Sequence, residues 1–409
     1  MSVNTDSGTA DSGSRNSGPL CSGAVRPHGH IPVTAPDHDQ LPPAPPTTVG
    51  VIESVATGTP RTTVRQADSA ARVANQDGDP TQRARITRIY DRTRIETRQL
   101  AVDPLDPDFL AFSGRRGTIR DRMNLFAEHA VPLAVEVAGR ALAGVADPAD
   151  IGLLVFVTST GLLAPGVDVA VQRELGLAPT VGRVVVNFMG CAAAMNGIRT
   201  AVDYVRAHPD RKAMVLCLEL SSVNAVFADD INDVIIHSLF GDGCGAVVVG
   251  AGRVRTPLAP GKVVVRDTFS QLLEDAADGI VLGINDNGIT CELAESLPQY
   301  ILRGVDPALA GVLARNHLGK HDVDLWAIHP GGPKIIDESV HSLGIAPELA
   351  RTSWETLARY GNMLSVSLLF VLERMIQQAD DSRPLSTGVA FSFAPGVTLE
   401  GMVFDIIRR

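Results

Sequence analysis

From residue 49 to the end of the chain, short apolar runs alternate with longer stretches in which apolar residues recur every three or four positions. Short runs rich in Val, Ile and Leu are typical of buried strands, and the spaced pattern is typical of helices that pack on one face. The stretch 124–143, with Leu125, Val131 and Val135 apolar, predicts such a helix. The predicted strands lie at 49–57, 151–158, 213–220, 246–249, 323–328, 389–393 and 402–407.

The alternation of strands and helices starts again near residue 263, after a first series that ends near 250. This repetition predicts two halves rich in βαβ units, 48–250 and 251–409, each contributing residues to one site. Successive βαβ units place their strands in one sheet with helices on its faces. The pattern therefore predicts an α/β fold with a mostly parallel, layered sheet.

Residues 1–47 have a different composition, rich in Ser, Gly, Pro, Thr and Asp and poor in aromatic residues. Such a segment cannot bury enough apolar surface to offset the entropy lost on ordering, so we interpret it as a disordered tail. His28, His30 and His38 lie in this tail, but no fixed scaffold holds them as metal ligands. Cys21 is interpreted as an inert, exposed thiol.

The whole-chain composition narrows the possible classes of protein. The chain has 409 residues with a net charge of −10 and no long basic run, which argues against nucleic-acid binding. No apolar stretch is long enough to span a bilayer, and the N-terminus lacks the features of a secretory signal. The five cysteines are odd in number and form no CxxC pair, which predicts reduced thiols in the cytoplasm and no zinc site.

The stretch 184–197 contains the strongest chemical candidate, Cys191. Three valines run into a turn that contains Gly190, and Ala-rich sequence that favours helix follows. Cys191 would then lie at a helix start, where free N–H groups and the helix dipole stabilise a thiolate. A buried structural cysteine is the alternative, since Cys is often buried, and only a nearby base would decide between the two.

Two later turns supply possible partners for this cysteine. His329 directly follows an apolar run and begins the sequence His-Pro-Gly-Gly-Pro. Asn362 follows Gly361 just before the apolar run 366–372. A single His or Asn at a turn is more often a cap or a turn former. A Cys, a His and an Asn, each next to its own apolar element, form a much more specific set.

The segments Gly-Cys-Ala-Ala at 190–193, Ile-His-Pro-Gly-Gly-Pro at 328–333 and Gly-Asn-Met at 361–363 resemble, in this order, the type III polyketide synthases, the chalcone synthase-like family. Leu-Phe-Gly-Asp-Gly at 239–243 agrees with that family, and Phe-Ala-Pro-Gly at 393–396 resembles its glycine-rich GFGPG loop. The resemblance implies a thiolase-like fold, a duplicated arrangement of α/β/α/β/α layers. It also implies a homodimer, in which the loop 158–166 reaches towards the partner's pocket.

The resemblance also implies the reaction. Cys191 would take an acyl starter from acyl-CoA, and His329 would pair with the thiolate and lower the pKa of the cysteine. Malonyl-CoA would lose carbon dioxide, with hydrogen bonds from His329 and Asn362 to the enolate oxygen, and the enolate would extend the chain. No metal or redox cofactor is expected beyond the coenzyme A thioesters, although an acyl carrier protein could deliver the acyl groups.

The resemblance further identifies residues of the substrate pocket. Phe240 matches one of two aromatic gatekeepers in the family, while the second falls on Cys291, a much smaller side chain. Asn224 matches a position that shapes the acyl cavity, Leu282 lies near its floor, and Ala164 replaces a larger residue of plant members. A pocket widened at Cys291 favours an aliphatic starter. The chain is therefore similar to bacterial alkylpyrone-type synthases that make pyrones or resorcinols.

Four basic residues match positions that hold the phosphates of coenzyme A. Arg85, Arg88 and Arg92 share one face of a predicted helix, and Lys334 follows the His329 turn. Arg binds phosphate in a bidentate way, which suits such a site. The ordinary alternative is a solvated basic face that pairs with nearby acidic residues.

Three other functions remain open from the sequence. A ketoacyl carrier-protein synthase of the third kind also uses Cys, His and Asn, although its His turn usually reads His-Gln-Ala-Asn. An acyltransferase could use Cys191 without extending a chain. A scaffold protein on the same fold would need none of the three residues for its function.

Overall fold

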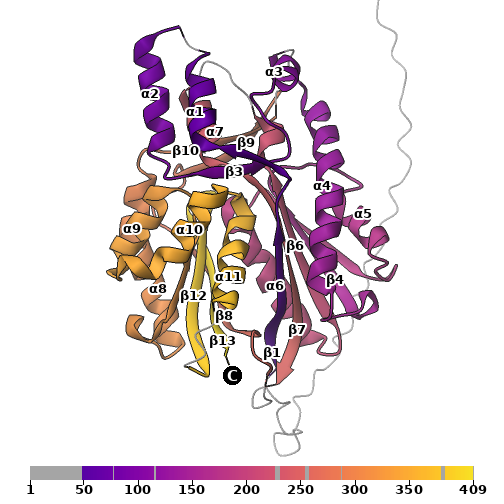
Figure 1. Ribbon diagram of the computed structural model, residues 1–409. Coiled ribbons are helices and arrows are strands. Elements are labelled where there is room, and N and C mark those ends of the chain that lie inside the picture. The colour runs from indigo at the N-terminus through magenta and orange to yellow at the C-terminus, as the bar shows by residue number, and fades with distance from the viewer. Residues whose placement is uncertain are drawn as a thin grey trace, which may run out of the picture. The chain divides into compact units, whose positions relative to one another are not determined.

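A central sheet of nine strands organises the fold (Figure 1). The computed structural model describes residues 48–76, 78–114, 117–225, 231–253, 258–286, 288–378 and 383–408. These residues form one compact unit. The predicted tail 1–47, with Cys21, His28, His30 and His38, lies outside the described residues.

Thirteen strands make up the described sheets. They are β1 (Thr48–Gly58), β2 (Thr62–Arg65), β3 (Thr97–Leu100), β4 (Ile151–Thr158), β5 (Gly182–Asn187), β6 (Lys212–Leu220), β7 (Asp242–Arg253), β8 (Val263–Leu272), β9 (Ile280–Asn285), β10 (Gly288–Leu293), β11 (Leu325–Ile328), β12 (Leu385–Ala394) and β13 (Thr398–Ile407). The nine-stranded sheet has the order β11-β12-β13-β8-β1-β7-β6-β4-β5, while β9 pairs with β10 and β2 with β3.

Eleven α-helices pack around these sheets in the described chain. They are α1 (Gln66–Ala74), α2 (Pro80–Asp91), α3 (Pro107–Gly114), α4 (Ile119–Leu142), α5 (Val167–Glu174), α6 (Ala193–Ala207), α7 (Ile231–Leu239), α8 (Leu297–Arg315), α9 (Pro333–Leu343), α10 (Arg351–Tyr360) and α11 (Ser367–Gln377). None of the described helices has the length and apolar character needed to cross a membrane.

The helices and the two ends of the sheet form five layers, which confirms the predicted α/β/α/β/α arrangement. Helices α4 and α5 pack on the β4–β7 end of the sheet, and α8 and α9 pack on the β11–β13 end (Figure 1). Helices α6 and α11 lie between the two ends and contact strands of both. Strand β4 is almost wholly buried because helices cover both of its faces, so its sequence is a continuous apolar run.

The prediction of a mostly parallel sheet is wrong. Only the pairs β4–β5, β4–β6 and β11–β12 are parallel, and the other five pairings of the nine-stranded sheet are antiparallel. Strands β12 and β13 show the reason, because three residues join them, too few for the crossover that parallel neighbours require. The predicted halves meet where β1 pairs with β8, and their division at residue 250 stays a prediction.

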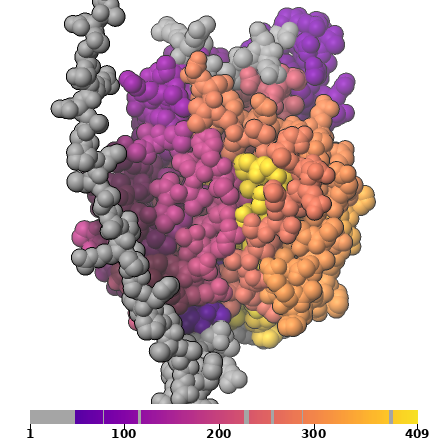
Figure 2. All heavy atoms as spheres, turned by 180° about the vertical axis from the view of Figure 1, so that it is seen from behind, coloured from indigo at the N-terminus to yellow at the C-terminus, as the bar shows by residue number. Residues whose placement is uncertain are grey.

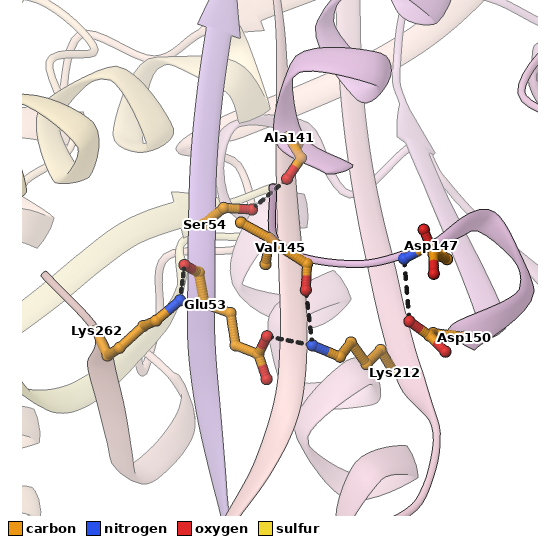
Figure 3. Close-up of polar contacts among 8 residues, drawn as sticks. All are labelled: Glu53, Ser54, Ala141, Val145, Asp147, Asp150, Lys212 and Lys262. Carbon is orange, nitrogen blue, oxygen red and sulfur yellow. Dashed lines mark hydrogen bonds and ion pairs between the residues drawn. The ribbon is translucent and has the colours of Figure 1, made fainter. Parts of the chain in front are cut away.

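Strand β1 has a bulge at Glu53, where polar contacts join it to neighbouring segments (Figure 3). The Glu53 carboxylate pairs with Lys212, which also donates to the Val145 carbonyl at 3.0 Å. Lys262 donates to the Glu53 carbonyl at 2.8 Å. A Cβ at Gly250 would lie 2.0 Å from the Glu53 carboxylate, so a side chain at this position would displace that carboxylate. The charged groups at the bulge are therefore paired and hydrogen-bonded.

Candidate active site

Cys191 lies in a tight turn between strand β5 and helix α6. The turn contains Phe188 and Gly190 in the left-handed region, with φ of 57° and 58°, and continues as a 3₁₀ turn over Gly190–Ala192. The Gly190 N–H donates to the Ser159 hydroxyl at 3.0 Å, which ties the turn to the end of strand β4. Helix α6 begins at Ala193, two residues after Cys191. The cysteine, predicted at the helix start, therefore lies just before it.

His329 directly follows strand β11, as predicted from the sequence. Its N–H donates to the Phe391 carbonyl at 3.0 Å and continues the pairing of β11 with β12. The side chain is 2% exposed, and neither ring nitrogen has a hydrogen-bond partner among the described residues. Buried polar atoms without partners are rare in folded proteins. The imidazole is therefore free to bond to a molecule that enters the site.

Asn362 is fixed by hydrogen bonds on both its backbone and its side chain. Its N–H donates to the Leu239 carbonyl at 2.8 Å, and its carbonyl accepts from the Gly241 N–H at 2.9 Å. The side-chain oxygen accepts from the Leu364 N–H at 2.9 Å, which orients the amide nitrogen towards Cys191. That nitrogen donates to the Gly331 carbonyl at 3.2 Å and lies 3.8 Å from the Cys191 sulfur.

One small cavity of about 40 Å³ is lined by Cys191, His329 and Asn362 together. The structure thus brings together three residues that are far apart in the sequence. Their chemical roles stay predictions. The rest of the wall is mostly apolar and includes Phe240 and Cys291.

A larger cavity of about 340 Å³ shares Phe240, Leu282, Cys291 and Leu364 with the small one. Asn224 also lines the larger cavity, so four of the five predicted pocket residues lie around these two spaces. Cys291 on β10 pairs with Leu282 on β9, which explains why both face the same space. The fifth residue, Ala164, is exposed in the loop between β4 and α5 and lines neither cavity.

Burial dominates the titration of the two central groups. It raises the pKa of the Cys191 thiol, and the hydrogen bond from Asn362 offsets only part of this effect. It also lowers the pKa of His329 to about 3. These directions are opposite to the predicted ion pair at rest, because both groups are removed from water and the charged forms lose their hydration. Burial by itself thus favours a thiol and a neutral imidazole, and the ion pair stays a prediction.

Glu219, near the end of strand β6, is a buried residue that the sequence analysis missed. One carboxylate oxygen accepts from the Ser159 N–H at 2.9 Å and the Thr160 hydroxyl at 2.8 Å, and the other accepts from Ser365 at 2.6 Å. Burial raises its pKa to about 7, while these hydrogen bonds lower it. The carboxylate therefore links Ser159, which bonds to the Cys191 turn, to Ser365, which lies three residues after Asn362. A single charge inside the apolar run 213–220 was the available signal.

The four predicted phosphate contacts are all exposed. Arg85 and Arg88 lie on helix α2, and Arg92 follows its last residue. Lys334 lies in the first turn of α9, 3.9 Å from Glu338. Their role is untested. Within the described residues, no cluster of three or more His, Cys, Asp or Glu side chains is arranged to hold a metal ion.

Comparisons with known proteins agree with this geometry. The family model of the chalcone and stilbene synthases, N-terminal domain, matches residues 47–253, and the C-terminal domain model matches residues 265–408. The chain is 67% identical over 371 residues to the alpha-pyrone synthesis polyketide synthase-like Pks18 of Mycobacterium tuberculosis, covering 90% of this chain and 94% of that protein. It is 33% identical to polyketide synthase 37 of Dictyostelium discoideum, covering 79% of this chain and 11% of that protein.

Solved structures give the same result for the fold. The crystal structure of PKS-I from the brown alga Ectocarpus siliculosus has a TM-score of 0.83 and 38% identity, covering 89% of this chain and all of that one. The 1,3,6,8-tetrahydroxynaphthalene synthase from Streptomyces coelicolor A3(2) has a TM-score of 0.78 and 24% identity, covering 88% of this chain and 99% of that one.

Proposed function

This chain belongs to the chalcone and stilbene synthase family and is a type III polyketide synthase, and on that premise we propose which residues perform each step and what product results. We propose that Cys191 carries an acyl starter, which is extended with malonyl-CoA and closed to an α-pyrone. The observation that supports this most strongly is the meeting of Cys191, His329 and Asn362 around one cavity that adjoins a larger chamber.

Loading begins from the neutral pair at rest. The His329 imidazole accepts the proton of the Cys191 thiol while the sulfur attacks the carbonyl carbon of acyl-CoA. The thioester bond to coenzyme A breaks, and coenzyme A leaves as its thiolate, which takes a proton. A thioester on Cys191 and free coenzyme A result. Burial disfavours the charged forms of both residues, so the proton should move as the sulfur bonds to the carbonyl carbon, with no separate thiolate formed first.

Extension uses the hydrogen-bond donors that face the sulfur. Malonyl-CoA loses its carboxylate as carbon dioxide, and the electron pair moves onto the thioester oxygen as an enolate. The Asn362 amide nitrogen and a His329 N–H donate to that oxygen. The enolate carbon then attacks the Cys191 thioester, forms a carbon–carbon bond and releases the Cys191 thiolate. Asn362 suits this role because its amide donates without acting as a base.

The shape of the chamber supports an aliphatic acyl-CoA starter. Cys291 occupies a position where an aromatic side chain would narrow the passage, and Leu282, Leu364 and Ile289 add apolar wall. Asn224 lines the same chamber, and its amide nitrogen bonds to the Thr160 carbonyl at 2.9 Å. The name of the relative from M. tuberculosis supports α-pyrone formation, with resorcinol formation as the alternative ring closure.

The proposed substrates and assembly follow from exposed features. We propose that Arg85, Arg88, Arg92 and Lys334 contact the phosphates of coenzyme A, or of a carrier protein's phosphopantetheine. Strand β5 has an open edge, with Val184 38% and Val185 50% exposed, and such an edge favours pairing with another strand. We propose a homodimer that covers this edge and places the loop with Ala164 near the partner's pocket.

The proposed reaction also bears on cofactor and compartment. Acyl transfer, decarboxylation and condensation each balance with the substrates and side chains named above, so we propose that no resident cofactor takes part. The nucleophile must remain a free thiol, and the four described cysteines are free. We therefore propose a cytoplasmic enzyme.

The test is to incubate the purified protein with malonyl-CoA and acyl-CoA starters of different length and to identify products by mass. We expect pyrones from aliphatic starters, release of carbon dioxide, and an acyl adduct on Cys191 that is absent in Cys191→Ala. A single condensation on a carrier protein would instead indicate a ketoacyl synthase. Acyl transfer without carbon dioxide release would indicate a non-extending acyltransferase. No adduct with any donor would indicate a scaffold.

A further inference from the structure

The last turn of helix α7 and Phe240, the residue after it, present four successive carbonyl groups to side chains and backbone of other segments. The His237 and Phe240 carbonyls accept from the Arg98 guanidinium, at 2.9 Å for Phe240. The Ser238 carbonyl accepts from the Gln66 amide at 2.7 Å. The Leu239 carbonyl accepts from the N–H of Asn362 at 2.8 Å. The Asn362 N–H therefore bonds to one carbonyl of this set, and Arg98 and Gln66 donate hydrogen bonds to the other three.

Arg98 and Gln66 are also bonded to each other. The Arg98 Nε donates to the Gln66 side-chain oxygen at 3.0 Å, and both residues are buried, with 4% and 5% exposed. They lie on β3 and at the start of α1, so neither belongs to the segments that carry the three reactive residues. We call these two residues the Arg98–Gln66 clamp.

The charge of Arg98 has no carboxylate within ion-pair distance in the described part of the chain. The nearby acids are bonded elsewhere, since Asp242 accepts from the Ala101 N–H and Asp103 pairs with Arg72. The partial negative charge at the C-terminal end of α7 takes the place of a counterion. A buried cation is costly, so its location against these carbonyls indicates a specific role.

The clamp also packs against the glycine that precedes Asn362. Gly361 has φ of 70°, and a Cβ there would lie 2.7 Å from the Leu239 carbonyl and 3.0 Å from the Arg98 side chain. Arg98 and Phe240 both line the larger cavity. A shift of Arg98 would therefore move the Asn362 backbone and the Phe240 wall together.

We propose that the Arg98–Gln66 clamp is a positioning device that sets the Asn362 amide for decarboxylation and extension, a proposal that rests on the function proposed above. The clamp touches neither Cys191 nor His329 through any hydrogen bond of the described residues. With acyl-CoA at saturation, so that weaker starter binding at the Phe240 wall does not limit the rate, its loss should slow the steps that use Asn362 and leave the loading of Cys191 nearly unchanged.

Arg408 provides a matched control. It is also buried, with 5% exposed, and it also donates to carbonyls at the end of a helix, those of Met375 and Ile376 in α11 at 3.1 and 3.2 Å. It lies after β13 and lines neither cavity of the site. Arg98→Lys and Arg408→Lys each keep a positive charge and lose the planar fork. They differ in which helix end is disturbed.

The experiment compares wild type, Arg98→Lys, Gln66→Met and Arg408→Lys in two single-turnover assays. One measures the rate of acyl adduct formation on Cys191, and the other the release of carbon dioxide from malonyl-CoA. A misplacement of about 1 Å can cost about 100-fold in rate, so we expect Arg98→Lys to slow carbon dioxide release by about 10- to 100-fold. We expect loading to change by less than about threefold and Arg408→Lys to change neither rate by more than about twofold.

Three outcomes would overturn the clamp proposal. Arg98→Lys could slow both steps equally, Arg408→Lys could have the same effect, or Arg98→Lys could slow carbon dioxide release as much in an Asn362→Ala background as alone. Gln66→Met should act in the same direction with a loss of about three- to tenfold, so the test does not depend on the folding of Arg98→Lys.

A measurement without substrate separates this proposal from the function proposed above. Amide hydrogen exchange of the segments 239–243 and 361–365 should be faster in Arg98→Lys than in Arg408→Lys, since the Asn362 and Gly241 N–H groups lose their fixed partners. Equal exchange in the two variants would contradict the clamp. Absence of carbon dioxide release in wild type would contradict only the proposed function.

Discussion

Polar side chains are half-buried at the Glu53 bulge and buried at the cavity of His329 and Asn362, and the two regions differ in how these side chains are paired. At the bulge the charged groups of Glu53 and Lys212 are matched with each other, and Lys212 also bonds to a backbone carbonyl (Figure 3). At the cavity both nitrogens of His329 have no partner among the described residues. A buried hydrogen-bonding group without a partner costs about 1–3 kcal/mol. The unpartnered His329 ring therefore indicates a place where a ligand supplies the missing hydrogen bonds.

The two regions lie at opposite ends of the same strand. Lys212 is the first residue of β6, and Glu219 is the last residue but one. The paired end is expected to stabilise the sheet, and the other end lies beside the residues proposed to react. The comparison therefore predicts that substitutions at the bulge change stability and spare the reaction, while substitutions at the cavity do the reverse.

His329→Gln should give the largest change in activity. Gln can donate a hydrogen bond but cannot take the thiol proton, so we expect carbon dioxide release and extension to fall by about 100- to 1,000-fold. Steady-state kinetics with malonyl-CoA measures this loss. A loss of less than about threefold would contradict the role of His329.

The same substitution should change stability with pH in a defined direction. The folded pKa of His329 is about 3, below its ordinary value of about 6.5, so the unfolded state binds more protons between these values. The free energy of unfolding of the wild type should therefore decrease as the pH falls from about 6.5 towards 3. Denaturant unfolding at several pH values should show His329→Gln gaining stability relative to wild type on acidification. An unchanged difference would contradict the buried, neutral imidazole.

Cys291→Phe should give an intermediate effect, because it alters the space around the reactive groups and leaves those groups in place. A larger side chain would fill the passage between the two cavities. We expect long aliphatic starters to lose about tenfold or more in kcat/KM relative to short ones. Ile284→Phe is the control, since Ile284 lies on the neighbouring strand β9 but is 53% exposed and lines neither cavity. Equal losses for all starters would argue against a role in selecting chain length.

Glu53→Gln should have the smallest effect on activity. It removes one charge of the pair with Lys212 and should lower the free energy of unfolding by about 1–3 kcal/mol. We expect kcat to remain within about twofold of wild type, measured beside denaturant unfolding at one pH. A tenfold fall in kcat would break the contrast between the two regions.

The sequence predicted local elements well where one apolar pattern dominated. Strand β4 matches its predicted range, β1 is one residue longer at each end, and β6 begins one residue earlier than predicted. Helix α4 begins five residues earlier than predicted, since Thr118 and Asp121 form a capping box before the apolar pattern starts. Strand direction was not predictable from periodicity, because both directions have the same alternation of side chains. Short connections, such as the turn with Pro395 and Gly396, do indicate direction, because they can join only antiparallel neighbours.

The three residues that meet at the small cavity could be picked out because each lies beside an apolar element in a turn with glycine. The residues that hold them were harder to find. Glu219 and Arg98 act through segments that are distant in the chain, such as Ser365 and the end of α7. Their importance depends on which segments the fold brings together. A single sequence shows only that a charge is present in an otherwise apolar or strand-forming stretch.

The burial that raises the pKa of the Cys191 thiol has a consequence for survival in an aerobic cell. Peroxides and simple alkylating agents react with thiolates, so a cysteine kept as a thiol reacts slowly with either. A nucleophile kept in this form would be expected to resist oxidation between turnovers. A covalent inhibitor of this site would need to resemble an acyl thioester, because an electrophile without that shape would react slowly with the protonated sulfur.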